Sequence, residues 1–385
     1  MRKIYYVGYY SGLENPNNFH EFPSSNSKMD YIISVIRRLN FNLTIFSLGF
    51  SKKKTCSFRK KKTIGLNQKT DFVFVSTISL SWSFLSFISK IWLYFQVIYL
   101  LVFIIKRDDI VLVYHSYLLN KVVNFCRLFS NFKLIYEVEE IYQAAWQNSE
   151  KKIEQEIKAL QKADGFILVN DIMAEKCNFN NKPFVVCYGS YMQKENLKIL
   201  INDGKVNLVY AGFIGGASSD VMLAIDTIDF LPDNYFLNVL GYGDEVNIRM
   251  MNNKIDQINV GNGVEKVKYF GCLTGYEYDS FLTKCQIGLS TRVLIDQYSD
   301  FTFPSKVLVY LSNNIIPVSS KINCISKSEV TKSVVFYDEN TPEAVAKSVL
   351  NINMNKYYSE NIDMINDLDS RFLDDFNKLL GDDIN

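Results

Sequence analysis

The sequence predicts an α/β protein made of two doubly wound, Rossmann-like units in series, each a parallel sheet with helices on both faces. Three observations support this prediction. Short apolar runs alternate with amphipathic helical segments along the chain, which is typical of parallel sheets. The pattern pauses in a polar stretch, 193–205, and then starts again. A length of 385 residues is also too great for one compact core and fits two domains.

The first domain is expected to span 1–192. Its expected strands are the apolar runs 4–7, 43–48, 71–76, 110–114, 133–136, 165–169 and 184–187. The run 110–114 is apolar throughout, as expected for a strand that is buried on both faces. Helical spacing predicts helices at 29–39 and 151–163, and a long polar loop separates the first strand from the first helix.

The second domain is expected to span 203–369. Its expected strands are 206–212, 236–243, 267–271, 287–290, 316–319 and 334–337. Helices are expected at 221–228 and 276–284, after Pro304, and from Thr341, where Pro342 occupies the first turn. The last helical segment, about 370–385, is expected to pack back on the first domain.

The composition narrows the class of protein. With 48% hydrophobic and 22% charged residues the chain is expected to be globular, and a net charge of +1 argues against a protein devoted to nucleic acid. The seven cysteines form no Cys-x-x-Cys pair and only two histidines are present, so the sequence offers neither the common zinc spacings nor a disulfide framework. A reducing cytoplasm is the expected compartment.

The segment around Pro304 is the most informative part of the chain. Pro304 fixes the start of a helix, Ser305 is expected to cap it, and Lys306 adds a cation at the same point. The free N–H groups and the dipole of a helix N-terminus favour an anion. These residues are therefore expected to hold the diphosphate of a nucleotide-linked donor. An ordinary capped helix with a surface lysine is the alternative interpretation.

Five short motifs of the second half occur in the order found in one enzyme family. They are 208–212 (LVYAG), 240–243 (LGYG), 267–271 (VKYFG), 285–289 (CQIGL), and 303–306 (FPSK) with 310–311 (YL) and 316–318 (IPV). Together they resemble the nucleotide-sugar-dependent glycosyltransferases of the GT-B fold, especially the retaining family 4 type and its bacterial polysaccharide-assembly branch. The resemblance implies two facing Rossmann-like domains with a cleft between them, acceptor binding in the first domain, and donor binding in the second. It also implies a nucleotide-diphosphate sugar as donor, and neither a bound metal nor another cofactor.

The first half resembles the family more loosely. The stretch 24–29 (SSNSKM) resembles the acceptor-side loop of bacterial relatives, 136–142 (YEVEEIY) their strand-to-helix segment, and 109–115 (DIVLVYH) their buried strand with a histidine near its end. His115 falls one position later than in the family pattern. The two glutamates that retaining members carry around the donor helix correspond here to Phe301 and Val309, which cannot accept a hydrogen bond through their side chains. This departure bears on ribose binding and on the retaining outcome.

The resemblance places donor-binding residues at the carboxyl ends of the second sheet. Glycines there are expected to allow close approach of the backbone to the donor, or to be plain turn residues. Arg292 is expected to add a forked hydrogen-bond donor, or to pair with Asp296 or Asp300. The expected donor-binding set is Gly212, Gly215, Gly216, Tyr242, Arg292, Ser305, Lys306 and Val309.

In the first domain His115, Glu139 and Glu140 are the expected catalytic residues. A histidine at the carboxyl end of a strand can hydrogen-bond the transferred sugar, or be satisfied by a neighbouring backbone group. A glutamate there can orient the acceptor hydroxyl or act as a base. The nearby Glu137 is interpreted as a solvated strand end.

The segment 82–105 is the most apolar of the chain and approaches the length of a membrane span. We expect a helix-turn-helix that lies against the first sheet and on the bilayer surface, because the serines around it are poor residues for a span; a buried helix pair is the alternative. The basic segment 52–62 is expected to attract anionic lipid. Trp82, Trp92 and Tyr94 suit a membrane interface.

These expectations combine into one function. The chain is expected to be a cytoplasmic glycosyltransferase, peripheral on the inner face of the plasma membrane, that moves a sugar from a nucleotide donor to a growing glycan. The expected acceptor is a lipid-linked bacterial surface polysaccharide, such as a capsule or O-antigen. A non-catalytic GT-B subunit that stabilises an active transferase is the alternative, and a GT-B enzyme of another reaction, such as a sugar-nucleotide epimerase, is a third hypothesis.

Overall fold

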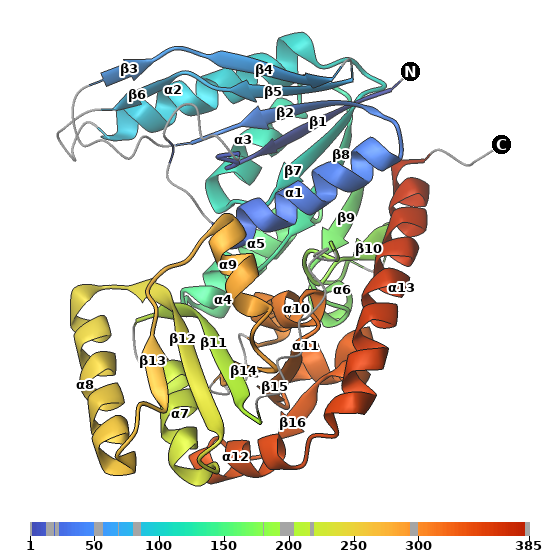
Figure 1. Ribbon diagram of the computed structural model, residues 1–385. Coiled ribbons are helices and arrows are strands. Elements are labelled where there is room, and N and C mark those ends of the chain that lie inside the picture. The colour runs from blue at the N-terminus through green and yellow to red at the C-terminus, as the bar shows by residue number, and fades with distance from the viewer. Residues whose placement is uncertain are drawn as a thin grey trace. The chain divides into compact units, whose positions relative to one another are not determined.

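The computed structural model describes residues 2–12, 19, 23–49, 57–67, 69–79, 86–179, 181–192, 204–215, 219–292 and 299–381. The chain divides into two compact units (Figure 1). The first unit holds Met1–Ser190 and Arg371–Asn385, and the second holds Tyr191–Ser370. Each unit is built on a sheet of mostly parallel strands, so the predicted α/β class with two Rossmann-like units is confirmed.

The first unit contains an eight-stranded sheet with the order β10-β9-β8-β7-β1-β2-β5-β4. Its neighbouring strands are parallel except for the edge pair β4 and β5. The strands are β1 (Lys3–Gly8), β2 (Asn42–Ser47), β4 (Lys62–Asn67), β5 (Thr70–Phe74), β7 (Ile110–Tyr114), β8 (Lys133–Val138), β9 (Gly165–Leu168) and β10 (Phe184–Val186), while β3 (Ser57–Arg59) and β6 (Thr77–Ser79) form a separate antiparallel pair. The strands β1, β7, β8 and β9 are almost wholly buried, as their continuous apolar runs predict.

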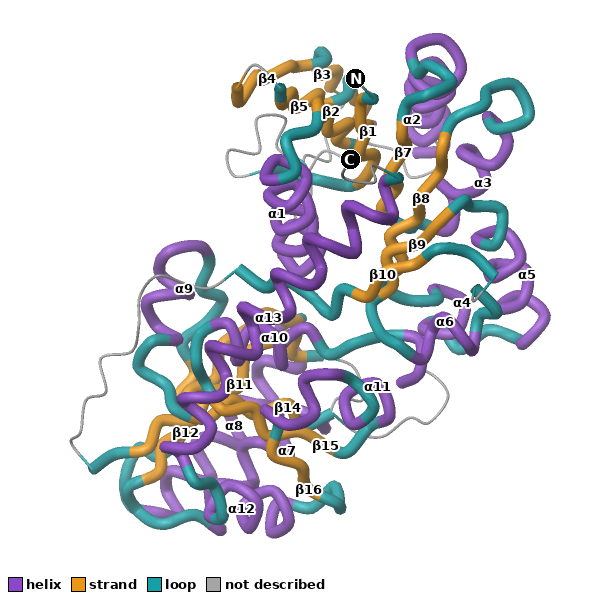
Figure 2. The backbone as a smooth tube through the Cα atoms, turned by 90° about the vertical axis from the view of Figure 1, so that its right-hand side faces the viewer, coloured by secondary structure: helices purple, strands orange, loops and turns teal. Residues whose placement is uncertain are grey.

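Helices cover the first sheet (Figure 2). They are α1 (Pro23–Arg38), α2 (Ser86–Tyr99) with the π-helical turn η2 (Leu100–Ile104), α3 (Tyr117–Cys126), α4 (Tyr142–Ala145), α5 (Glu150–Leu160) and α6 (Ile172–Lys176). The end of α13 (Met354–Leu380) also belongs to this unit from Arg371 onward. There the ring of Phe372 lies 5.6 Å from that of Tyr31, and Lys133 Nζ donates a hydrogen bond to the Leu379 carbonyl at 2.6 Å.

The second unit contains a six-stranded parallel sheet with the order β13-β12-β11-β14-β15-β16. Its strands are β11 (Val206–Ile214), β12 (Tyr235–Gly243), β13 (Val267–Tyr269), β14 (Ile287–Ser290), β15 (Ile316–Ser320) and β16 (Val335–Tyr337). Its helices are α7 (Ser219–Asp226), η3 (Thr227–Phe230), α8 (Glu245–Asn262), α9 (Gly275–Leu282), η4 (Ser299–Phe301), α10 (Ser305–Ser312), α11 (Asn323–Ser326), η5 (Glu329–Ser333), α12 (Pro342–Leu350) and most of α13.

The second sheet is packed on both faces, because alternate residues of a strand point to opposite sides. Leu208 and Tyr210 of β11 join a core with α7, α8 and α12. Val209 and Ala211 join a separate core with Leu282 of α9 and Tyr310 of α10. The protein therefore buries two apolar layers around this sheet, as a doubly wound fold requires.

Both sheets reverse their strand order once. In the second unit the chain winds outward from β11 through β12 to β13, then returns to the other side of β11 with β14. In the first unit the same reversal separates β1 from β7. Ligands of open parallel sheets bind beyond the carboxyl ends of the strands at such a reversal. The topology therefore marks one place in each unit where a site is expected.

Two expected helices differ from the structure. The first helix begins at Pro23, well before residue 29, because the polar stretch after Pro23 is helical and not a loop. The helix-turn-helix expected within 82–105 is wrong for the described residues, since α2 and η2 form one continuous helix from Ser86 to Ile104. Trp82 lies outside the described part of the chain.

Candidate functional site

In the second unit, β11 and β14 separate as they approach their carboxyl ends. They pair only at Leu208 with Ile287 and at Val209 with Gly288. Beyond this point β11 stays paired with β12 up to Ile214, while β14 continues beside β15. The separation leaves an opening at the strand reversal, where the fold predicts a ligand.

The helix α10 is fixed over this opening by Tyr310. The Tyr310 hydroxyl accepts a hydrogen bond from the Ala211 N–H at 3.1 Å and lies 3.2 Å from the Leu289 carbonyl oxygen. The ring lies against Gly288, where a Cβ atom would come within 2.3 Å of it. Only glycine leaves room for this ring, so Gly288 and Tyr310 together hold α10 against β11 and β14.

Lys306, one helical turn before Tyr310, extends into the opening. Its ammonium nitrogen lies 3.9 Å from the centre of the Tyr210 ring, although Tyr210 belongs to the core on the other side of the sheet. A Cβ atom on Gly212 would lie 3.2 Å from the same nitrogen. The side chain therefore passes between the diverging strands and holds a positive charge at the carboxyl end of β11.

The environment of Lys306 makes its charge costly. Burial lowers the pKa of its ammonium group to about 8, against the attraction of Asp220, while the Arg292 cation lowers the pKa further. Within the described part of the chain no carboxylate lies within ion-pair distance of Lys306. An anion bound here would stabilise the charged form of Lys306 and raise its pKa toward the ordinary value. The same free energy would strengthen the binding of the anion.

The start of α10 differs from the prediction in one respect. Ser305 does not cap the helix, because the extended residue Pro304 occupies the capping position and has no side-chain hydrogen bond to offer. Ser305 is instead the exposed first residue of α10. The Val307 N–H of the first turn donates to the Pro304 carbonyl at 3.0 Å, so the groups that can receive an anion beside Lys306 are the Ser305 hydroxyl and the N–H groups of Ser305 and Lys306.

The other predicted donor residues lie on the same edge of the second sheet. Arg292 follows β14, and its backbone carbonyl accepts a hydrogen bond from Ser320 Oγ at 3.0 Å. Tyr242 is 49% exposed near the end of β12, where its ring packs edge-on against that of Phe213. Val309 differs, because it is partly buried against the α9 and α10 core and acts there as a packing residue.

The glycines at this edge have different surroundings. Gly212 pairs with Gly241 in the register of β11 and β12, and a Cβ atom on Gly241 would fall within 1.9 Å of the Gly212 carbonyl oxygen. Gly215 is buried against the Phe213 ring. Gly216 lies outside the described residues. Close backbone packing therefore explains Gly241, whereas Gly212 faces the Lys306 ammonium group.

In the first unit, the carboxyl end of the sheet carries a buried polar cluster that consists of Tyr6, Lys28, Glu137 and Glu139. Glu137 is 0% exposed and accepts a hydrogen bond from the Tyr6 hydroxyl. Lys28, on α1, forms an ion pair with Glu139 at 3.0 Å and donates a hydrogen bond to the Cys187 carbonyl. The interpretation of Glu137 as a solvated strand end is therefore wrong.

This cluster retains a proton that an ordinary carboxylate would lose. Burial raises the pKa of Glu137 to about 8, and the charge of Glu139 adds to the rise, against the opposing effects of Lys28 and Tyr6. Lys28 is also buried, but the nearby acidic groups raise its ammonium pKa above the ordinary value. The Lys28 ammonium group thus lies beside both Glu137 and Glu139. The Glu139 side chain remains partly exposed to solvent.

The three predicted catalytic residues are not equally accessible. His115 is 1% exposed, with its Nε2 3.1 Å from Glu156 Oε1 and its ring 5.0 Å from that of Tyr142. Its surroundings are those of a histidine packed beside a buried carboxyl group, and its contact with a sugar stays a prediction. Glu139 and Glu140 are half-buried after β8, where an acceptor hydroxyl can reach a carboxylate without rearrangement of the core.

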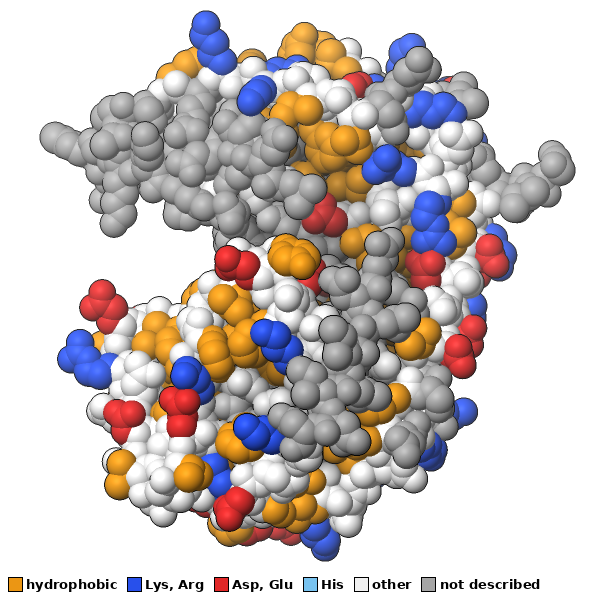
Figure 3. Space-filling model, viewed as in Figure 1, with side chains coloured by type: hydrophobic (Ala, Val, Ile, Leu, Met, Phe, Trp, Pro, Cys, Tyr) orange, Lys and Arg blue, Asp and Glu red, His pale blue; other side chains and the backbone are white. Residues whose placement is uncertain are grey.

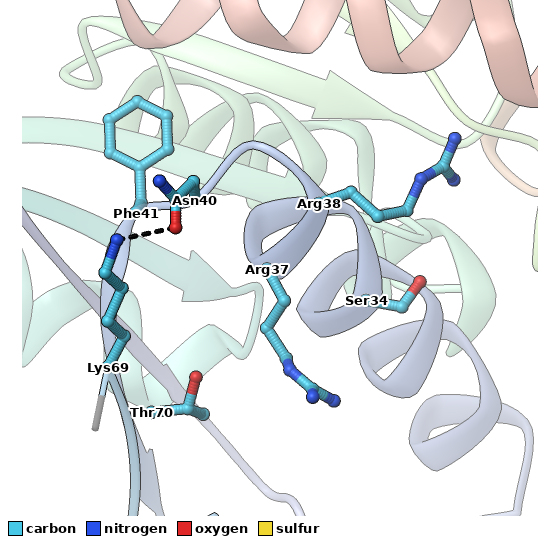
Figure 4. A pocket seen from close by; sticks show the side chains of 7 residues that line it. All are labelled: Ser34, Arg37, Arg38, Asn40, Phe41, Lys69 and Thr70. Atoms are coloured by element: carbon cyan, nitrogen blue, oxygen red, sulfur yellow. Dashed lines mark hydrogen bonds between the residues drawn. The ribbon is translucent and has the colours of Figure 1, made fainter. Parts of the chain in front are cut away.

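A basic hollow lies at the end of the first sheet where β2 and β5 begin, opposite to the carboxyl ends of the strands (Figure 4). It has a volume of about 660 Å³ and is lined by Ser34, Arg37, Arg38, Asn40, Phe41, Lys69 and Thr70. Lys69 Nζ donates a hydrogen bond to Asn40 Oδ1 at 2.6 Å across its margin. None of the predicted site residues lines this hollow. Among the described residues, no group of three or more His, Cys, Asp or Glu side chains is placed to hold a metal.

Sequence reasoning missed several residues of these two sites. Asp220 lies in the first turn of α7, where its carbonyl accepts a hydrogen bond from Thr291 Oγ1 at 2.5 Å. The sequence pattern predicts Tyr210 only as part of a strand and Lys28 only as part of a loop. The alternation along β11 could have placed Tyr210 on the face of Gly212, but no local signal connects Lys28 with Glu137.

The whole chain was compared with known proteins. No family model and no curated protein sequence matches it. Several solved structures are similar in fold: the sucrose-phosphate synthase of Thermosynechococcus elongatus has a TM-score of 0.71 at 12% identity, with 98% of each chain covered. The trehalose-6-phosphate synthase of E. coli, bound to UDP-2-fluoro glucose, has a TM-score of 0.69 at 11% identity, with 99% of each chain covered.

The lipopolysaccharide outer core galactosyltransferase WaaB has a TM-score of 0.58 at 14% identity, with 98% of this chain and 99% of that chain covered. These similar structures are glycosyltransferases of the GT-B type. The match extends over both units and not over a single Rossmann-like half. Together with the two strand orders, it shows that this chain has the GT-B fold.

Proposed function

We propose that the protein is a glycosyltransferase that moves a sugar from a nucleoside-diphosphate donor to a glycan acceptor. The observation that carries the proposal is the placement of Lys306, a costly cation at the strand reversal of the second sheet, beside the uncapped start of α10. Breaking the bond between sugar and diphosphate leaves negative charge on the leaving group. Lys306, Arg292 and the N–H groups of α10 are the groups of this chain that stabilise such charge.

The acceptor is expected on the first unit. A carboxylate that binds an acceptor or takes its proton must be reachable from solvent and held in one orientation. Glu139 is partly exposed, and its ion pair with the buried Lys28 fixes its orientation. Glu137 then acts as a positioning residue for Glu139. Because Glu137 keeps its proton and is hydrogen-bonded to the Tyr6 hydroxyl, the charge of Lys28 is left to pair with Glu139. Donor and acceptor groups therefore come from different units of the chain.

The finer parts of the proposal rest on the sequence resemblance. They are a lipid-linked bacterial surface glycan as acceptor, a retaining outcome, no requirement for a metal, and a cytoplasmic location at the inner face of the plasma membrane. The similarity to a lipopolysaccharide galactosyltransferase supports the class of acceptor. On the face drawn in Figure 3, acidic and basic side chains are interspersed over the second unit, which supports a small-molecule donor and not a nucleic acid.

A non-catalytic GT-B subunit is the second candidate, and one observation favours it. Val309 packs against the α9 and α10 core, at a position where the resembled family carries a glutamate. A subunit without that carboxylate would keep the fold and lose part of its donor contacts.

Isothermal titration of the whole protein with uridine, guanosine and thymidine diphosphates separates the two candidates. Binding of one diphosphate is expected, and Lys306→Met should weaken it by about tenfold or more, the free energy of one charge-assisted hydrogen bond. The matched control is Lys327→Met, which removes an exposed lysine of the same unit. No binding to any nucleotide would favour the subunit, and equal loss of nucleoside and diphosphate binding would contradict a phosphate role for Lys306.

A further inference from the structure

One face of the first unit is apolar and exposed. The helix from Phe87 to Ile104 is long and apolar enough to cross a membrane by length and composition, yet only 22% of it is buried. A helix in the core of a soluble domain would be mostly covered. We define the outer side of α2, η2 and α3 as the apolar face.

The apolar face has a regular origin in the sequence. Large apolar side chains recur at every fourth position of α2 and η2, so they lie on one side of the helix. They are Phe87, Ile91, Phe95, Tyr99 and Phe103, which are between 49% and 71% exposed. The helix α3 packs beside α2 and η2 (Figure 2). It adds Leu118 and Phe125, and the turn that follows it adds Leu128 and Phe129, of which Leu128 is 76% exposed. The two helices together make a broad surface and not an isolated apolar residue.

The inner side of α2 is attached to the first unit by hydrogen bonds and by buried apolar side chains. Gln96 makes hydrogen bonds with the backbone and the hydroxyl of Ser76, at 2.7 to 3.1 Å, and Trp92 Nε1 donates to the same hydroxyl. Leu93, Val97 and Leu101 are buried beneath the helix. A spanning helix would have to give up these contacts, so α2 lies on a surface and does not cross it.

Charged side chains around the apolar face are mostly basic. Lys106 and Arg107 follow η2 directly and are exposed, Lys90 lies along α2, and Lys121 lies along α3. Asp108 is the exposed acidic residue at the end of η2, whereas Asp109 is buried and accepts hydrogen bonds from backbone N–H groups. A second copy of the chain on this face would bring the basic margins together and would be repelled. An anionic surface would complement them.

We propose that the apolar face of α2, η2 and α3 docks the protein on the surface of an anionic lipid bilayer. Phe103, Leu128 and Phe129 enter the interface, and Lys106, Arg107 and Lys121 contact lipid phosphates. The value of such docking for a lipid-linked acceptor rests on the proposed function, but the docking itself does not. Trp92 and Tyr94, which the sequence predicts at a membrane interface, are half-buried, and Tyr94 Oη lies 3.4 Å from Tyr9 Oη; their contact with lipid stays a prediction.

The test is co-sedimentation of the whole protein with vesicles of phosphatidylglycerol and phosphatidylcholine, compared with phosphatidylcholine alone. The protein is expected to bind the anionic vesicles, and binding should weaken in high salt. Phe103→Ser with Leu128→Ser should reduce partitioning about tenfold or more, since each side chain contributes apolar area to the interface. Lys106→Gln with Arg107→Gln should reduce it by about fivefold per charge.

The matched control is Met250→Ser with Val260→Ser, which removes two exposed apolar residues of α8 in the second unit. Partitioning of this control should equal that of the unchanged protein. Absence of vesicle binding would overturn the proposal, and so would equal loss in the control. A dimer in sedimentation velocity that only the Phe103 and Leu128 variant abolishes would assign the face to a second copy instead. Because no nucleotide is used, failure here is independent of failure to bind a donor.

Discussion

The Lys306 ammonium nitrogen lies 3.9 Å from the centre of the Tyr210 ring, although the two residues belong to opposite sides of the second sheet. They meet because β11 and β14 stop pairing after Val209 and Gly288, which opens the sheet at its strand reversal. The sheet thus supplies both the electron-rich ring and the gap through which the cation reaches it.

The first prediction concerns the pH dependence of donor binding. The Lys306 pKa of about 8 means that the side chain is charged below pH 8 and neutral above it. Affinity for uridine diphosphate should therefore fall as the pH rises from 7 to 9, by up to about tenfold. Lys306→Arg keeps its charge throughout this range and should give a flatter profile in calorimetric titration. Parallel profiles for both proteins would contradict the assignment.

The second prediction concerns the space between Gly288 and Tyr310. Gly288→Ala places a Cβ atom within 2.3 Å of the Tyr310 ring, so α10 must shift. Urea unfolding should show a loss of about 1–3 kcal/mol, the usual cost of overpacking. Gly261→Ala is the matched control, because nothing lies within 4 Å of a Cβ atom there and α8 is helical at that point. That change should stabilise the protein by about 0.5–1 kcal/mol.

The third prediction concerns Glu137 and pH. The folded protein raises the pKa of this carboxyl from 4.5 to about 8, so it binds the proton more tightly than the unfolded chain does. The contribution of Glu137 to stability is thus fully present below pH 4.5 and is lost as the pH rises toward 8. Glu137→Gln removes this loss and should gain stability relative to the unchanged protein between pH 5 and pH 9. Lys28, Glu139 and Tyr6 face the same carboxyl and remain in the variant.

Glu265→Gln is the control for this measurement, because Glu265 is an exposed residue. Its stability difference should stay constant over the same pH range. A constant difference for Glu137→Gln as well would show that the carboxyl titrates normally.

The fourth prediction compares two ion pairs. Lys28→Met removes the buried partner of Glu139 and leaves two carboxyl groups without their cation, so it should destabilise the first unit by about 3 kcal/mol. Lys158→Met breaks an exposed pair with Glu154 on α5 and should cost less than about 0.5 kcal/mol. Thermal unfolding of both variants measures the two losses of stability. Similar losses would show that burial does not make the Lys28 pair more important for stability than the exposed pair.

Most strands of both sheets could be predicted from the sequence because their signal is local, but the edge strand β4 (Lys62–Asn67) of the first sheet was not predicted. A continuous apolar run such as 110–114 indicates a strand buried on both faces wherever it occurs, and the structure confirms it. The donor helix was predicted for the same reason, since Pro304 and the apolar residues after it are neighbours in the sequence. Local signals thus predict the fold class and the helix α10, while the donor site at its start stays a prediction.

The remaining errors concern contacts between distant residues. Glu137 is buried because Tyr6 and Lys28 reach it from β1 and α1, and no feature near Glu137 records this. The helix-turn-helix was expected because the serines around 82–105 are poor residues for a membrane span, but α2 and η2 continue without a break, and Gln96 within them is satisfied by Ser76. The partners of Glu137 and Gln96 both come from the tertiary structure, which the sequence near each residue does not show.

The tie between Gly288 and Tyr310 suggests how distant relatives of this chain can be recognised. A lysine one helical turn before a tyrosine, with a glycine on the preceding strand to receive the ring, forms a three-residue signature that overall identity would not detect. The rest of α10 is constrained too, because Val307, Leu308 and Leu311 are buried. A larger residue at the glycine position would push the tyrosine ring away and with it the helix that carries the lysine.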